Sequence, residues 1–168
     1  TDAYIGAMLN MANGHLHPLN LCIGEANAAV ANGATIYEDS PVLRIEPGKR
    51  ATVTTEHGSV SADFVVLAGN AYHDLAPKLR GAMFPVHSFI IATEPLSANL
   101  IAQINPQDVA VCDPNFVLEY FRLSADKRLL FGGRYNYFGN DPDVIRGKLR
   151  PKMLRIYPQL ADTKIDFA

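Results

Sequence analysis

The stretch Phe64-Val65-Val66-Leu67-Ala68-Gly69-Asn70-Ala71 decides the fold that this sequence predicts. Four consecutive large apolar residues are typical of a strand buried on both faces, as the central strands of a parallel sheet are. The small residues after them predict a tight turn, with no Cβ at Gly69. In open α/β sheets ligands bind beyond the carboxyl ends of the strands, so this turn is a candidate ligand site. An ordinary strand-to-helix turn with a purely steric glycine is the alternative.

The composition and charge of the chain favour a globular protein over a nucleic-acid-binding or membrane protein. The chain has 168 residues, of which 48% are hydrophobic, enough for one good-sized core or two small ones. Lysines and arginines number 15 against 17 acidic residues, and no basic cluster suggests a nucleic-acid partner. No apolar run approaches the roughly 20 residues of a membrane span, and the first residues given do not show a basic stretch followed by an apolar core. We therefore expect a soluble, cytoplasmic protein without a nucleic-acid or membrane partner.

Cysteines and histidines give weak signals. Cys22 and Cys112 are far apart in sequence and have apolar neighbours, which favours reduced, buried side chains over a disulfide. His15 and His17 lie in a turn before Pro18, but no further ligand stands at metal-binding spacing beside them. A capping or cleft-lining role is the better interpretation of the pair, and no metal is expected.

The first half of the chain has an α/β pattern. Small residues predict a helix over residues 19–32, and Gly33 is placed to end it. Beyond it we expect strands at 34–38 and 42–46, an antiparallel excursion through 51–56 and 60–62, the buried strand at 64–67, and a helix over 71–79 capped by Asn70.

The second half has an antiparallel pattern, after a change of composition at residues 81–85. Strands are expected at 86–93, 109–112, 116–123 and 129–135, and a polar hairpin loop at 124–128. Residues 95–101 predict a helical turn that starts near Ser97. Asp141 and Pro142 open a last helix that Pro158 ends, and Pro151 predicts a kink or break within it.

The ends of the chain suggest a longer protein. The sequence does not begin with Met, and residues 163–168 alternate as an incomplete strand would. We interpret the chain as part of a longer one, with a processed tail as the alternative.

Several segments follow one another in the order found in one enzyme family. They are NGHLHP (13–18), ANGA (31–34), SPVLRI (40–45), GSVSADFVVLAGNAY (58–72), ATEPL (92–96) and LFGG (130–133). In this order they resemble the FAD-dependent D-amino-acid oxidase superfamily, and the resemblance spans nearly the whole chain.

This resemblance implies a fold class and an activity. The fold is α/β (α+β): residues 1–82 would form part of a Rossmann-like FAD-binding domain with a β-meander, and residues 83–168 part of a mainly antiparallel substrate-binding domain with covering helices. The activity would be oxidation of the C–N bond of a small amine or amino acid by hydride transfer to FAD. Oxygen and another electron acceptor both remain open, as does the oligomeric state.

The resemblance also assigns cofactor residues. Pro41 and Val42 would pass the adenine side of FAD, and the turn formed by Ala68, Gly69 and Asn70 would lie against the cofactor. The Gly-rich G-x-G-x-x-G turn that carries the pyrophosphate in such folds is absent from this sequence. We therefore expect the chain alone neither to hold FAD tightly nor to turn over.

On the substrate side, the resemblance points to Tyr120 and Arg134 on neighbouring strands. Tyr120 would donate a hydrogen bond to the substrate, and Arg134 would offer a forked cation to a carboxylate. Gly132 and Gly133 remove side chains where the strand would pass a bulky group, which the resemblance identifies as the flavin ring. No catalytic residue is assigned.

Alternation along the strand separates the neighbours of Tyr120. Arg122 is expected to share its face and Glu119 to point away from it. A sheet-edge tyrosine and a solvated arginine are the structural alternative to a substrate site.

Two other classes of function stay open at this point. The chain could be a binding domain that takes a small carboxylate without catalysis. It could also be a partner-binding domain whose edge strand at 163–168 pairs with another chain.

Overall fold

The chain forms two compact units. The structure, a computed structural model, describes residues 1–70, 72, 74–136 and 141–168, and only the backbone of Arg134 and Tyr135. Contacts between Cα atoms separate a small-sheet unit, Leu19–Pro85, from a large-sheet unit made of Thr1–Pro18 and Val86–Ala168. The division after Pro85 lies near the expected boundary at residue 82, but the first 18 residues group with the second half. The assignment of these units to cofactor and substrate stays a prediction.

The small-sheet unit begins with the predicted helix, α1 (Pro18–Ala31). Gly33 ends it in a left-handed conformation, at φ 94°. The amide of Gly33 donates to the carbonyl of Val30, and that of Ala34 to Ala29. These two hydrogen bonds form the Schellman motif, which satisfies carbonyls at the helix end and favours glycine because of its positive φ.

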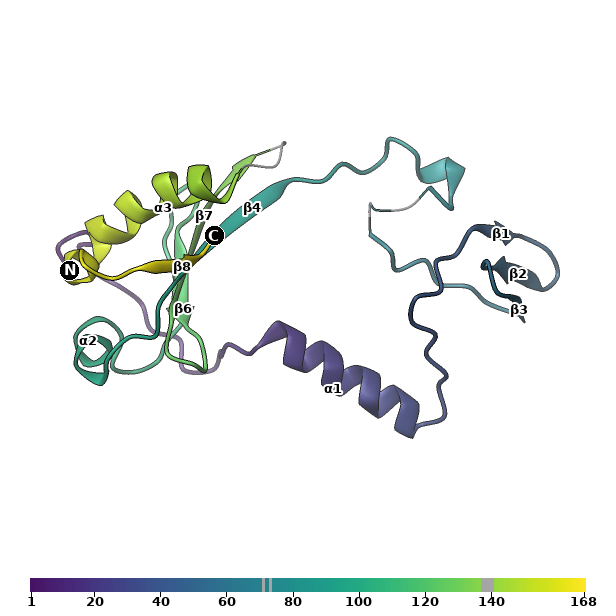
Figure 1. Ribbon diagram of the computed structural model, residues 1–168, viewed down its shortest axis with the longest axis horizontal. Coiled ribbons are helices and arrows are strands. Elements are labelled where there is room, and N and C mark those ends of the chain that lie inside the picture. Colours follow the sequence, from purple (N-terminus) through teal and green to yellow (C-terminus); the bar gives the residue numbers. More distant parts are fainter. Residues whose placement is uncertain (71, 73, 137–140) are drawn as a thin grey trace. The chain divides into compact units, whose positions relative to one another are not determined.

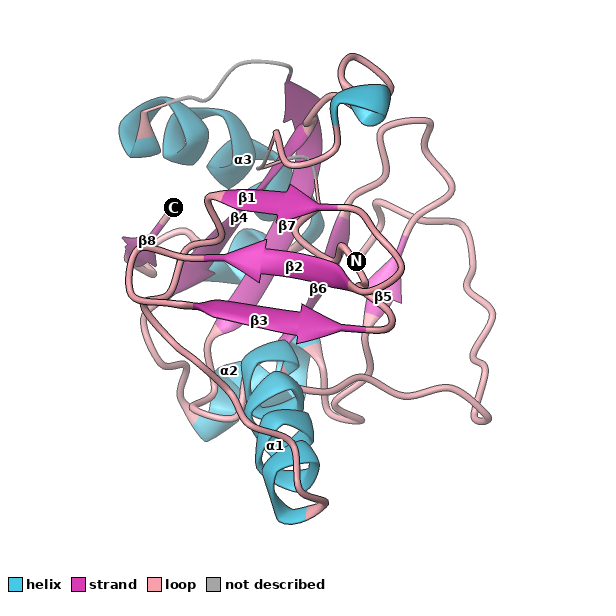
Figure 2. Ribbon diagram, turned by 90° about the vertical axis from the view of Figure 1, so that its right-hand side faces the viewer, coloured by secondary structure: helices cyan, strands magenta, loops and turns pink. Residues whose placement is uncertain are grey.

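A three-stranded antiparallel meander follows in this unit (Figure 2). Its strands are β1 (Arg44–Glu46), β2 (Ala51–Thr54) and β3 (Ser59–Ala62). Val53 pairs with Ile45 on one side and Val60 on the other. The meander confirms the predicted excursion, and the strand expected at 42–46 is its first strand, antiparallel to β2.

The strands expected at 34–38 and 64–67 are absent from the described chain, so those two predictions are wrong for this unit. Residues 34–38 and 64–67 have no strand assignment, and Phe64 and Val66 are 90% and 86% exposed. A strand exists only where a neighbour accepts and donates its ladder hydrogen bonds, and the described sheet of this unit is the meander alone. The apolar stretch therefore lies open to solvent.

The turn after this stretch also differs from expectation. Asn70 has a left-handed backbone, at φ 54°, whereas an N-cap residue is extended. The predicted helix over 71–79 includes Ala71 and His73, which lie outside the described residues. Of its described part, only Pro77–Leu79 is helical, as the 3₁₀ turn η1.

The large-sheet unit is built on a five-stranded antiparallel sheet in the order β5-β6-β7-β4-β8. The strands are β4 (His87–Thr93), β5 (Val111–Cys112), β6 (Tyr120–Leu123), β7 (Leu129–Asn136) and β8 (Ile165–Phe167). They confirm the four predicted strands, with β5 and β6 shorter than expected, and the strand character of residues 163–168.

Helices in this unit begin where the sequence predicts. Ser97 caps α2 (Ala98–Ile104) by accepting a hydrogen bond from the amide of Leu100. Asp141 caps α3 (Pro142–Ile156) by accepting from the amide of Asp143. Of the kink or break predicted at Pro151, the break is wrong, because α3 continues through Pro151 as one helix and ends before Pro158, whereas a kink there stays a prediction. Pro158 instead opens the 3₁₀ turn η2 (Pro158–Leu160).

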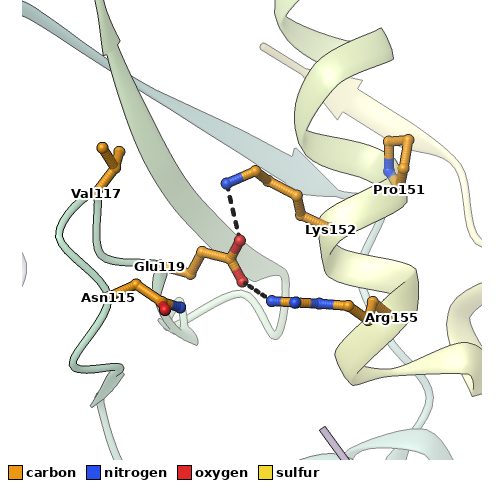
Figure 3. A pocket seen from close by; sticks show the side chains of 6 residues that line it. All are labelled: Asn115, Val117, Glu119, Pro151, Lys152 and Arg155. Atoms are coloured by element: carbon orange, nitrogen blue, oxygen red, sulfur yellow. Dashed lines mark hydrogen bonds and ion pairs between the residues drawn. The ribbon is translucent and has the colours of Figure 1, made fainter.

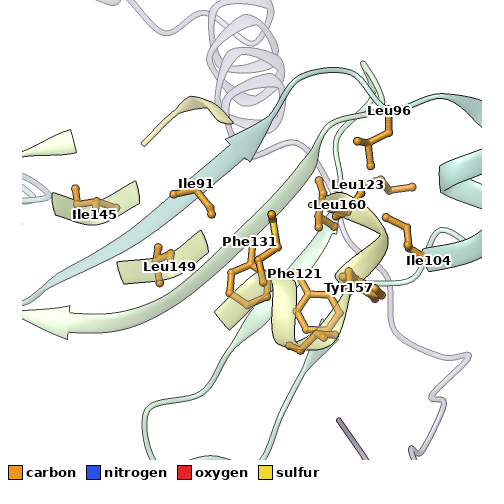
Figure 4. Close-up of a cluster of buried hydrophobic side chains, with 13 residues drawn as sticks. Ile91, Leu96, Ile104, Phe121, Leu123, Phe131, Ile145, Leu149, Tyr157 and Leu160 are labelled. Atoms are coloured by element: carbon orange, nitrogen blue, oxygen red, sulfur yellow. The ribbon is translucent and has the colours of Figure 1, made fainter. Parts of the chain in front are cut away.

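The core lies on one face of the five-stranded sheet. Helix α3 packs along β4 and β7 (Figure 1). Phe131 stacks on Phe121 at 5.5 Å between ring centroids, and Tyr157 meets Phe121 edge-on at 5.4 Å. Burial raises the pKa of Tyr157 to about 12. Figure 4 shows this cluster, whose fully buried members are Ile91, Leu129, Phe131, Leu149, Met153, Ile156 and Leu160.

No helix among the described residues combines the length and the apolar character needed to cross a bilayer.

Truncation of Leu149 tests the contact between α3 and the sheet. Leu149 is fully buried, whereas Val144 on the same helix is 41% exposed. Leu149→Ala should lower the free energy of unfolding by about 2–5 kcal/mol, because it removes buried methyl groups and leaves a cavity. Val144→Ala, the matched control, should cost less than about 1 kcal/mol. Denaturant melts of both variants measure the difference, and equal losses would show that α3 is not seated on the sheet through Leu149.

Candidate functional site

The face of the large sheet opposite the core carries the predicted substrate residue. Along β6, Phe121 and Leu123 are 4% and 2% exposed and point into the core. Tyr120 and Arg122 alternate with them and lie on the opposite face. We call this second face the open face. The expectation that Arg122 shares the face of Tyr120 is thus confirmed.

Tyr120 lies across the backbone of the neighbouring strand. It pairs with Gly132 of β7, and a Cβ added to Gly132 would stand 2.2 Å from its ring. Its hydroxyl is 3.5 Å from the Oγ of Ser88 on β4. The bulky group beside Gly132 is therefore the ring of Tyr120 itself, a correction to the expectation that the two glycines make room for an external ring.

Gly133 faces the core side of the sheet. A Cβ there would meet the carbonyl oxygen of Leu118 at 3.4 Å and the Cγ of Glu119 at 3.5 Å. The glycine pair thus allows close packing on both sides of β7, against Tyr120 on one and Glu119 on the other.

Arg134 lies in β7, next to β6, as predicted. The β4–β7 register shifts between Ser88 and Phe89, which pair with Tyr135 and Gly133, so Arg134 occupies the irregular position between them. Its side chain lies outside what the structure describes, and its role stays a prediction.

Arg122 and His15 meet at the hairpin end of the open face. The Nη1 of Arg122 is 3.4 Å from the Nδ1 of His15 and donates to the carbonyl of Leu123 at 3.2 Å. The Nε2 of His15 lies 2.9 Å from the carbonyl oxygen of Asp108. His15 therefore lies on this surface, and a capping or cleft-lining role for the histidine pair stays a prediction.

A buried carboxylate lies on the core side, directly before Tyr120 in sequence. Glu119 is 3% exposed, and its carboxylate pairs with Lys152 at 2.8 Å and with Arg155 at 3.0 Å (Figure 3). Both cations come from α3. The carboxylate stands in a pocket of about 410 Å³, lined by Asn115, Val117, Glu119, Pro151, Lys152 and Arg155. The prediction that Glu119 points away from Tyr120 is confirmed, but its partners gave no signal in the sequence, since they lie more than 30 residues away.

Asp113 fixes the loop that leads into β6. Its Oδ1 accepts from the amides of Asn115 and Glu119, and its Oδ2 accepts from the Asn115 side chain and from the hydroxyl of Tyr4. Burial alone would raise the pKa of Asp113, but these hydrogen bonds outweigh it and hold the pKa below its ordinary value. Burial, together with the charges of Asp113 and Glu119, raises the pKa of Tyr4 to about 12.

The predicted cofactor residues lie in the small-sheet unit. Ala68, Gly69 and Asn70 are exposed, and the amide of Tyr72 donates to the carbonyl of Gly69 at 3.3 Å, which closes a turn. The small side chains and exposed backbone of this turn fit close contact with a nucleotide cofactor. Val42 is half-buried beside exposed Pro41. These residues fit one edge of an FAD site, whereas the sequence has no Gly-rich turn for the pyrophosphate.

The two cysteines differ from expectation in their exposure to solvent. Cys22 and Cys112 are free, as expected, but both are exposed, so the prediction that they are buried is wrong. Cys112 pairs with Tyr120 across β5 and β6. Within the described ranges, no three His, Cys, Asp or Glu side chains gather as metal ligands would.

Comparison with curated proteins gives relatives over almost the full length of the chain. Gamma-glutamylputrescine oxidoreductase of Escherichia coli (strain K12) is 43% identical over 169 residues, which cover 99% of this chain and 40% of that protein. The chain thus spans about two fifths of the length of this relative.

Solved structures share the fold. L-proline dehydrogenase from P. horikoshii matches with a TM-score of 0.69 at 19% identity, over 88% of this chain and 41% of its own. Glycine oxidase from Geobacillus kaustophilus matches with a TM-score of 0.65 at 19% identity, over 87% and 39%. These likenesses confirm the predicted fold class, a mixed α/β architecture with an antiparallel second half.

A protein-family model shows to which family the chain belongs. The model described as FAD dependent oxidoreductase, DAO, matches residues 1–168, the entire chain. This match and the 43% identity confirm the resemblance first seen in six short segments. The chain belongs to the DAO family of FAD-dependent oxidoreductases.

Proposed function

We propose that the protein oxidises the C–N bond of a small amine or amino acid with FAD as its cofactor, and that a gamma-glutamylated amine is the first substrate to test. The observation that carries this proposal is the 43% identity to gamma-glutamylputrescine oxidoreductase over 99% of the chain. Identity at this level over so much of the chain favours a shared reaction class.

The residues proposed to hold FAD lie on one unit. Ala68, Gly69 and Asn70 would meet the cofactor through backbone groups, because their side chains are small and the turn is exposed. Pro41 and Val42 would contribute contacts on the adenine side. Bound FAD supplies the acceptor for the hydride that leaves the substrate carbon.

The residues proposed to meet the substrate lie on the other unit. The hydroxyl of Tyr120 can donate a hydrogen bond to a substrate oxygen, and its ring is held by the flat backbone at Gly132. Arg134 is the residue that the family resemblance assigns to a substrate carboxylate, through its forked guanidinium. The carboxylate of Glu119, fixed by two cations on the core side, holds the strand at the residue before Tyr120.

Flavin content and turnover test the proposal directly. The complete natural protein that carries this chain should purify yellow, with a flavin absorbance band, and should oxidise gamma-glutamylputrescine. Residues 1–168 alone should be colourless, because they lack a Gly-rich turn whose helix N-terminus would carry the pyrophosphate. A complete protein with no flavin, or with flavin but no amine oxidation, would disprove the proposed function.

A pair of glycine substitutions tests whether Tyr120 matters for turnover. Gly132→Ala places a Cβ 2.2 Å from the Tyr120 ring, so the ring or the strand must move. We expect the free energy of unfolding to fall by about 1–3 kcal/mol, and kcat/KM of the complete enzyme to fall with it.

The matched control is Gly147→Ala in α3, where a Cβ meets nothing within 4 Å. Alanine is a better helix former than glycine, so this variant should be as stable as the parent or up to about 1 kcal/mol more stable, with unchanged kcat/KM. Thermal melts and steady-state kinetics compare the two. Unchanged kinetics in Gly132→Ala would remove Tyr120 from the proposed substrate site.

A further inference from the structure

Arg122 and Arg150 are the two described arginine side chains without a carboxylate partner. Among the side chains that the structure describes, no carboxylate lies within ion-pair distance of the Arg122 guanidinium, and its contacts are the ring of His15 and the carbonyl of Leu123. Apart from Arg150, which donates to a backbone carbonyl, the other described arginines pair with carboxylates. These are Arg44, Arg50, Arg80, Arg128, Arg146 and Arg155.

His15 holds the Arg122 guanidinium in place. The Nε2 of His15 lies 2.9 Å from the backbone oxygen of Asp108, to which it donates, and 3.9 Å from the Oδ1 of the same residue. In the tautomer with its proton on Nε2, the Nδ1 is an acceptor, and it faces the Nη1 of Arg122. One tautomer satisfies both contacts. His15 thus orients the arginine without neutralising it.

The position of Arg122 relative to Tyr120 follows from the strand register. Tyr120 pairs with Gly132 and Arg122 with Leu130, both on the open face. Two residues along a strand are about 6.5–7 Å apart. Arg122 therefore lies one step from Tyr120 toward the hairpin, and the backbone of Arg134 lies beyond Gly132 in the other direction.

A half-buried guanidinium without a counter-charge is a preferred place for an anion. Both contacts of the Arg122 guanidinium with described residues are made by its Nη1. The N–H groups on Nε and Nη2 can therefore form the fork that binds a carboxylate. We propose that Arg122, oriented by His15, binds the carboxylate of the amine substrate on the open face and selects amines that carry one, in place of Arg134, whose backbone lies on the other side of Tyr120. This inference rests on the proposed function and names a specificity residue for it.

The experiment compares one substrate with its neutral isostere. The complete protein is assayed with gamma-glutamylputrescine and with the analogue in which the carboxylate is a carboxamide. In Arg122→Ala, kcat/KM for the carboxylate substrate should fall by about 10- to 100-fold, as for loss of a charge-assisted hydrogen bond, while the carboxamide should change less than about threefold. The inhibition constant of propionate, an unreactive carboxylate, should rise in parallel.

Further variants separate this role from a structural one. Arg122→Lys keeps the charge and the fold but lacks the fork, so it should lose part of the same preference. His15→Ala should raise KM for the carboxylate substrate without lowering kcat. Arg150→Ala is the matched control, a half-buried arginine on α3 that also lacks a carboxylate partner. Its substrate preference should equal that of the parent.

Each result decides between definite outcomes. If Arg122→Ala and Arg122→Lys reduce both substrates equally, or neither, the inference is wrong while the amine oxidation of the parent keeps the proposed function. If the parent oxidises neither substrate, both fail together.

Discussion

The packing of α3 against the β4–β7 ladder is the contact on which the large-sheet unit depends. Phe131 and Leu149 are fully buried there, and the aromatic stack of Phe121 on Phe131 continues the same core. Once one face of the sheet is buried, the register of every strand is fixed, because a slip of one residue would turn apolar side chains to solvent. The same constraint places Tyr120 and Arg122 together on the open face.

Local signals predicted the elements of this unit well. The caps at Ser97 and Asp141 are decided by one side chain and an amide two or three residues away, so a short stretch of sequence contains all the information. The hairpin at 124–128 is closed by Ser124 and Arg128 in the same way. Pro151 was misjudged, because a single missing amide did not interrupt a helix held along its length by buried residues.

Contacts between distant residues could not be predicted. In the sequence, Glu119 is an ordinary polar residue in an alternating pattern. Its partners Lys152 and Arg155 come close to it only in the folded chain. His15 likewise reads as half of a histidine pair, whereas its partner Arg122 lies 107 residues away. The prediction of a buried strand at 64–67 is wrong for a related reason. The composition of this stretch indicates burial on both faces, but burial is a property of neighbouring strands, and the described unit does not contain them.

Two charged side chains near the start of β6, Glu119 just before the strand and Arg122 within it, lie on opposite sides of the large sheet and have different roles. On the core side Glu119 is almost fully buried, and an unpaired carboxylate there would be strongly destabilising, so two cations from α3 are required beside it. On the open face Arg122 is only half-buried and meets two neutral acceptors. The first charge is neutralised within the chain and holds the strand in place. The second is left available, and a charge left available beside Tyr120 is what recognition of an anionic substrate requires.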